Sequence, residues 1–156
     1  MIVVTGVARS GTSHTMRLLL SLGYETPAPK FLPEHEKIID KNPEGFYELY
    51  HEIIGGIHTD VYKGMVVKLF PPTLFISDLS LIDKLIICHR DYDGFIKSYT
   101  PIHKILNEPY DPKTIYEWNY GVISQLKRMF DCCEINFEEH KNPNKLKRKL
   151  KKYLSS

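Results

Sequence analysis

The sequence has few cysteines and no long apolar stretch. Only three of its 156 residues are Cys, and the adjacent pair Cys132–Cys133 makes neither a disulfide framework nor a Cys-x-x-Cys motif. No apolar run approaches the roughly 20 residues that a membrane-spanning helix needs, and the run beginning at Ile2 is too short for a secretory leader. We therefore expect reduced thiols, a cytoplasmic location and no membrane partner.

The composition also excludes a disordered or fibrous chain. Hydrophobic residues make up 42% and charged residues 26%, and 156 residues predict one domain spanning 1–156. The net charge of +2 is uneven, because Lys141–Lys152 holds seven of the 21 basic residues and no acidic one. Leucines every four residues at 146, 150 and 154 predict a helix with a buried stripe and solvated cations. We therefore do not expect nucleic acid as a partner.

Short apolar segments alternate with helical patterns, which predicts an α/β fold. The expected strands are Ile2–Thr5, Met65–Leu69, Lys84–His89 and Cys133–Phe137. The expected helices are Ser13–Leu22, 34–40, 46–54, Asp93–Tyr99 with a break at Pro101, Thr114–Phe130 with Trp118 in the core, and Asn144–Leu154. The third strand is apolar at 85–88, with Cys88 in the core, which is typical of a parallel sheet covered on both faces. We predict a three-layer α/β/α domain around a parallel sheet.

A glycine-containing loop follows the first strand. It reads Gly6-Val7-Ala8-Arg9-Ser10-Gly11-Thr12-Ser13 and opens a helix. Glycines allow backbone N–H groups to converge on a phosphate, and the helix N-terminus adds partial positive charge. The nucleotide P-loop pattern is matched at Gly6, Gly11 and Ser13, but Thr12 stands where that pattern needs Lys, and Arg9 supplies the cation instead. The loop predicts a P-loop-like fold that binds a phosphate-like group.

This loop resembles the 5′-phosphosulfate loop of sulfotransferases that use 3′-phosphoadenosine 5′-phosphosulfate (PAPS). That loop has Lys or Arg, then Ser-Gly-Thr, then Thr or Ser. The family has a second motif, an Arg at a strand end and a Ser eight positions later, which Arg90 and Ser98 match. The family holds the donor's 3′-phosphate with this pair, and a guanidinium fork beside a hydroxyl suits phosphate oxygens.

The resemblance implies a compact sulfotransferase of bacterial or viral type on a minimal sulfotransferase fold. PAPS would be the donor and adenosine 3′,5′-bisphosphate (PAP) the product, with no metal. His14 stands where the family often has Trp against the adenine. The implied donor-binding residues are Gly6, Arg9, Ser10, Gly11, Thr12, Ser13, His14, Arg90 and Ser98.

The resemblance also implies catalytic residues. Arg9 and Lys68 would stabilise charge on the sulfuryl group during in-line displacement. The base stays open, because Phe70 stands where cytosolic members place a catalytic His. The segment Asn42–Glu48 resembles one that borders the acceptor cleft, and Glu34, His35, Glu44 and Glu48 all lie where a base is expected; we favour Glu48.

Two other functions fit the same residues. One alternative is a nucleotide- or PAP-binding protein without transfer activity. The other is a nucleotide kinase, which Thr12 disfavours because it replaces the lysine of the nucleotide P-loop. The acceptor implied for a transferase is a hydroxyl or amine of a small molecule or a glycan. Because few residues remain for an acceptor pocket, a pocket completed by the second subunit of a homodimer is one alternative.

Overall fold

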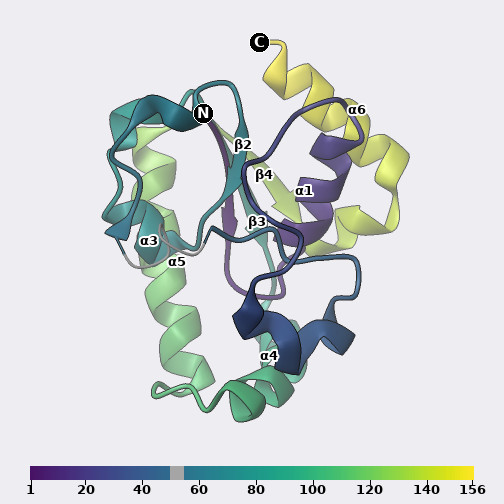
Figure 1. Cartoon of the computed structure of the whole chain (residues 1–156), viewed down its shortest axis with the longest axis vertical. Helices are drawn as coiled ribbons and strands as arrows, with labels where there is room; N and C mark the ends of the chain where they lie inside the picture. Colours follow the sequence, from purple (N-terminus) through teal and green to yellow (C-terminus); the bar gives the residue numbers. More distant parts are fainter. Residues whose placement is uncertain (50–54) are drawn as a thin grey trace.

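The computed structural model describes residues 1–49 and 55–156. Its centre is a four-stranded sheet in the order β2-β1-β3-β4 (Figure 1). The strands are β1 (Ile2–Gly6), β2 (Val66–Lys68), β3 (Lys84–His89) and β4 (Cys132–Asn136). Every neighbouring pair is parallel. The predicted α/β architecture with a central parallel sheet is confirmed.

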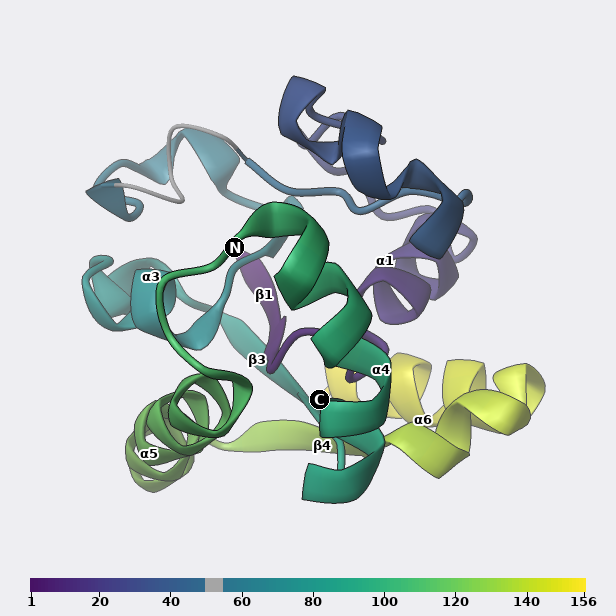
Figure 2. The same cartoon turned by 90° about the horizontal axis from the view of Figure 1, so that it is seen from below.

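Helices cover both faces of this sheet (Figure 2). On one face lie α1 (Thr12–Leu20) and α6 (Pro143–Leu154). On the other lie α3 (Pro71–Phe75), α4 (Tyr92–Leu106) and α5 (Pro112–Met129). Short 3₁₀ helices connect them: η1 (Pro33–Lys41), η2 (Asp60–Tyr62), η3 (Leu79–Leu81) and η4 (Phe137–Lys141). In the described ranges, no helix has the length and apolarity needed to cross a membrane.

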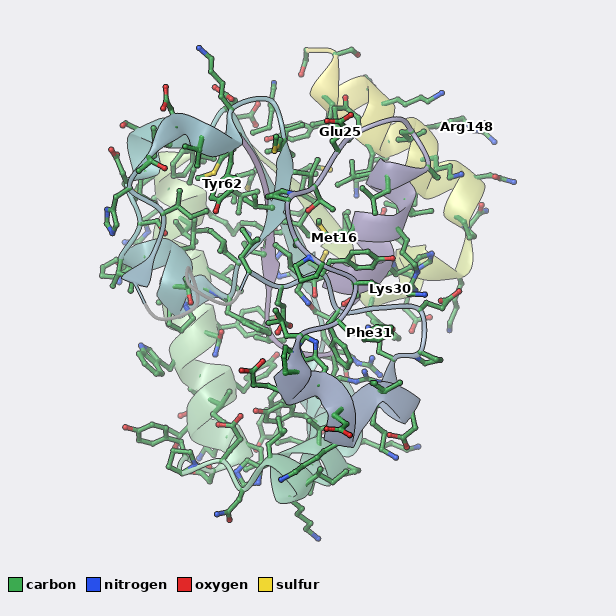
Figure 3. All side chains as sticks on the ribbon, viewed as in Figure 1. Met16, Glu25, Lys30, Phe31, Tyr62 and Arg148 are labelled. Atoms are coloured by element: carbon green, nitrogen blue, oxygen red, sulfur yellow. The ribbon has the colours of Figure 1, made fainter. Side chains whose placement is uncertain are left out.

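The apolar strands explain the two layers. Successive strand residues point to opposite faces, so Val3 packs with the α3–α4–α5 side and Val4 with the α1–α6 side. Cys88 is fully buried, as expected. Met16 of α1 is fully buried on the sheet, whereas Arg148 of α6 points away from it (Figure 3). The predicted buried leucine stripe of α6 is confirmed at Leu146 and Leu150 and is only partly buried at Leu154.

The strand order places a topological switch point between β1 and β3. The chain leaves β1 through α1 on one face, and it leaves β3 through α4 on the other face. The two connections therefore diverge at the carboxyl ends of adjacent strands. Open parallel sheets bind ligands at such a switch point, and both predicted anion motifs begin there.

The predicted helix over 46–54 is wrong where the structure describes it. Phe46–Leu49 is not helical, and Glu48 forms an isolated parallel bridge with Lys68. Contacts with distant residues replace the helical bonds: Tyr47 has φ of 58°, and the Phe46 N–H donates to the Lys30 carbonyl at 2.8 Å. Lys30 is labelled in Figure 3. Residues 50–54 lie outside the described ranges.

Two further expectations fail in the helices that cover the second face. Pro101 does not end its helix; α4 continues through it because Phe95, Tyr99 and Ile102 form one buried stripe that spans the proline. Trp118 is not a core residue, since its exposed fraction is 56%. The buried face of α5 is made by Val122, Ile123 and Leu126 together with Asn119, and Trp118 lies outside it.

Candidate anion-binding site

The predicted phosphate loop is a tight turn between β1 and α1. A Cβ on Gly6 would collide with the carbonyl oxygen of Cys88, and the Ser10 N–H closes a turn on the Val7 carbonyl at 3.2 Å. Gly11 is the N-cap of α1 with φ of 97° and supplies no side-chain cap. The first amide groups of a helix have no intrahelical partner, so at α1 they remain available to an anion.

Gly11 also lies beneath the ring of His140. A Cβ at this position would overlap the His140 ring. We expect Gly11→Ala to lower the free energy of unfolding by at least about 2 kcal/mol, because backbone strain and a steric clash coincide. The matched control is Gly23→Ala, which has a similar φ of 93° but open space around it and measures the strain alone. Urea unfolding of both variants checks this; equal losses would contradict the role of the His140 contact.

The two sequence motifs meet in space at Arg9. Its Nε donates to Ser98 Oγ at 3.0 Å, and its carbonyl accepts from Arg90 Nη1 at 2.9 Å. Arg90 also lies over the Phe137 ring, 3.5 Å from the centroid. The fold therefore brings Arg9 into contact with two residues, Arg90 and Ser98, that follow it by more than 80 positions in the sequence. Arg9 and Arg90 follow the ends of β1 and β3, and Ser98 lies in α4.

This cluster has positive charge without a counter-ion. Among the described residues, no carboxylate forms an ion pair with Arg9 or Arg90. The neighbouring Asp91 instead caps α4 by accepting from the Gly94 N–H at 2.9 Å. Arg90 Nε is buried and has no hydrogen-bond partner in the described ranges. Burial, and then the charge of Arg90, lowers the pKa of Arg9. Such a pair favours an anion placed between the two cations.

A second polar group lies on the other side of the loop. Lys68, at the end of β2, bonds Glu48 Oε1 at 2.8 Å and Ser13 Oγ at 3.3 Å. The second oxygen of Glu48 faces His35 Nε2 at 2.9 Å. The Lys68 side chain is only 4% exposed and the Glu48 side chain 12%. The loop hydroxyl of Ser13 thus joins the phosphate loop to a buried ion pair.

Glu48 is held in its ionised form. Burial raises the pKa of this carboxyl, but the Lys68 ammonium and the His35 hydrogen bond outweigh it and lower the pKa to about 2. A carboxylate with so low a pKa is a weak base while Lys68 remains bound to it. Glu48 is therefore the counter-ion of Lys68.

Histidine rings cover the start of α1. The rings of His14 and His140 lie 4.9 Å apart. Both ring nitrogens of His140 are buried without a hydrogen-bond partner in the described part of the chain. Burial, followed by the neighbouring His14, lowers the pKa of His140 to about 4. Sequence reasoning missed His140, because its contact with Gly11 joins distant parts of the chain that no local motif connects.

The predicted site residues fall into one continuous region. The loop residues Gly6–Ser13 lie between the Arg9–Ser98–Arg90 cluster and the Lys68–Glu48 pair. Of the other candidate bases, Glu44 pairs with Arg17 at 2.8 Å and Glu34 is exposed. Neither of these two carboxylates contacts Lys68.

Supporting residues hold Arg90 in place. The Tyr116 hydroxyl donates to the Arg90 carbonyl at 2.9 Å, and the Arg90 N–H donates to the Tyr120 hydroxyl at 3.0 Å. A cleft of about 560 Å³ opens beside Arg90 between α5 and η4, with His89 and Phe137 in its lining. Sequence reasoning did not identify Tyr116 and Tyr120 as supports of Arg90. Their four-residue spacing, which puts them on one helix face, is the signal that could have done so.

Comparison of this chain with protein-family models, curated proteins and solved structures finds no match. In the described ranges, no cluster of three or more His, Cys, Asp or Glu side chains is arranged to hold a metal ion.

Proposed function

We propose that this chain is a sulfotransferase that takes its sulfuryl group from PAPS. The observation that carries the proposal is a pair of partly buried arginines at the switch point, Arg9 and Arg90, with no carboxylate partner among the described residues. Partly desolvated cations that lack a counter-ion favour the binding of an anion. The resemblance of the loop and of the Arg90/Ser98 motif to PAPS-dependent enzymes supports the same assignment.

The site offers two places for anionic groups. One is the predicted phosphate loop, where Lys68 bonds the Ser13 hydroxyl in the first turn of α1. The other is formed by Arg90 and Ser98 at the end of β3 and in α4. The Arg9 side chain donates to Ser98, and the Arg9 carbonyl accepts from Arg90. Arg9 therefore connects the two anion sites. Two linked anion sites suit a nucleotide that carries phosphate groups at two positions.

The chemistry follows from these positions. Arg9, Lys68 and the loop amides stabilise negative charge that develops on the transferring sulfuryl group and on the leaving phosphate oxygen. A hydroxyl or amine of a small molecule or glycan attacks the sulfur in line. Glu48 is our candidate for the proton acceptor. The site residues proposed to bind the donor are those of the loop, with His14, Arg90 and Ser98.

One contact weighs against a nucleotide kinase. In P-loop NTPases the Ser or Thr at the position of Ser13 holds Mg²⁺. Here that hydroxyl accepts a hydrogen bond from the Lys68 ammonium at 3.3 Å and donates to the Phe46 carbonyl at 3.3 Å. The lysine that the kinase loop needs is replaced by Thr12. A nucleotide-binding protein without transfer activity remains the alternative, on the same scaffold.

Calorimetric titration with PAP, AMP and ATP tests the proposal. We expect PAP to bind at least about tenfold more tightly than AMP, because Arg90 and Ser98 add charge-assisted hydrogen bonds to the 3′-phosphate. Equal affinity for PAP and AMP would contradict the proposed role of Arg90 in binding the 3′-phosphate. It would also contradict the proposal that the chain is a PAPS-dependent sulfotransferase. Transfer of labelled sulfate from PAPS to a panel of acceptors then separates an enzyme from a binding protein.

A further inference from the structure

His35 is a buried histidine beside the Glu48 carboxylate. It lies in η1, is 5% exposed, and packs against the Phe46 ring with the ring centroids 4.3 Å apart. Its Nδ1 accepts a hydrogen bond from the Leu32 N–H at 2.9 Å. Its Nε2 faces Glu48 Oε2, also at 2.9 Å. Both ring nitrogens are therefore engaged.

These two contacts fix where the proton of His35 resides. A backbone N–H can only donate, so Nδ1 carries a lone pair and the ring is neutral with its proton on Nε2. The Nε2–H then donates to Glu48. His35 has no free nitrogen to take a proton from a substrate, whereas among the described residues Glu48 Oε1 bonds only the Lys68 ammonium, at 2.8 Å.

We propose that His35 is a positioning residue that holds Glu48 Oε2, so that Glu48 Oε1 becomes the proton acceptor when an anionic donor draws Lys68 away. The proposal rests on the proposed sulfuryl transfer. Lys68 already bonds the phosphate-loop hydroxyl of Ser13, so it can turn from Glu48 toward an anion in that loop. Glu48 then keeps its orientation through the hydrogen bond to His35.

The reaction balances with the groups named. The acceptor's O–H or N–H bond breaks, and the proton passes to Glu48 Oε1. The acceptor's electron pair forms the new bond to sulfur. The bond between sulfur and the 5′-phosphate oxygen breaks, and its electron pair leaves on PAP. No oxidant, reductant or further reactant is required.

In the described ranges, two titratable groups face Glu48. Lys68 faces it from β2 and His35 from η1, and these are the groups that hold its pKa low. Burial lowers the pKa of Lys68, against the opposing effects of Glu48 and, last, of Cys88 in β3. Removing the His35 hydrogen bond therefore raises the pKa of Glu48, and a base with a raised pKa loses activity at a higher pH.

Two substitutions separate positioning from packing. His35→Gln can place an amide N–H where Nε2–H donates to Glu48, whereas His35→Asn is too short to reach Glu48 but can still accept from the Leu32 N–H. We expect His35→Asn to lower kcat about tenfold or more. We also expect it to move the acidic limb of the pH profile of kcat/KM to higher pH. His35→Gln keeps that limb in place and kcat within about threefold of the unchanged chain. KM for PAPS stays the same in both.

The proposal is overturned if His35→Asn leaves kcat and the acidic limb unchanged, or if the Gln variant loses as much as the Asn variant. A measurement on the unchanged chain needs neither folding of variants nor activity: nitrogen-15 NMR should show His35 as the Nε2–H tautomer. A protonated Nδ1 would refute the proposal even if PAPS is the donor. Failure of PAP to bind the unchanged chain would instead refute the proposed function and leave the tautomer result intact.

Discussion

Arg90→Ala is expected to weaken PAP binding about 100-fold or more and to bring it to the level of AMP. Each hydrogen bond to a charged group contributes about 1.5–3 kcal/mol, and a guanidinium makes two to one phosphate. Among the described residues, Arg90 Nε has no hydrogen-bond partner, and the guanidinium lies over the Phe137 ring without a carboxylate partner. Calorimetric titration of PAP and AMP into both proteins measures the change.

Three controls separate this effect from damage to the loop. Arg90 donates to the Arg9 carbonyl, so AMP affinity must stay within about threefold of the unchanged chain for the loop to be intact. Arg90→Lys keeps the charge but removes the fork, and an intermediate loss is expected. Arg17→Ala removes a cation that is paired with Glu44 at the surface and should leave both affinities unchanged. An Arg90→Ala variant that binds PAP as tightly as the unchanged chain would contradict the assignment of the 3′-phosphate site.

The order of the elements was predictable because the strands are short, apolar and bounded by polar or glycine residues. The third strand is the clearest case: Leu85, Ile86 and Ile87 are fully buried, which their continuous apolar pattern predicts for a central parallel strand. The starts of helices were less well predicted, although capping residues in the sequence mark two of them. Asp111 and Asn142 each precede a proline and cap α5 and α6, an arrangement typical of helix starts. These caps place both starts one or two residues earlier than periodicity did.

The residues of the candidate site were predictable by type but not by pairing. Gly6, Arg9 and Arg90 stand in short motifs, so their positions at strand ends follow from the sequence. The pairing of Glu48 with Lys68 does not, because it depends on a non-helical segment with Tyr47 at φ of 58°. A positive φ at a tyrosine has no local sequence signal. Contacts of this kind come from tertiary packing, which overrides local propensity.

Lys68→Met is expected to lower the free energy of unfolding by about 3–5 kcal/mol at neutral pH. The substitution leaves the Glu48 carboxylate buried without its ammonium partner, and an uncompensated buried charge has a cost of that size. Phe46 and Phe70, whose rings lie 6.0 and 5.6 Å from Lys68 Nζ, cannot replace the charge. Urea unfolding at neutral pH measures the loss.

The pH dependence and a double variant show whether the lost charge is the cause. In the unchanged chain the depressed Glu48 pKa contributes stability that is fully present above about pH 4.5 and is lost as pH falls toward 2. In Lys68→Met the Glu48 pKa rises, so the deficit shrinks as the solution is acidified. Adding Glu48→Gln should restore most of the stability at neutral pH. Lys127→Met, which removes a half-exposed partner of Glu134, should leave the stability nearly unchanged because surface ion pairs contribute little. A deficit that is independent of pH and persists in the double variant would mean that Lys68 stabilises the fold by packing, and the charge exchange proposed for Glu48 would then lose its physical basis.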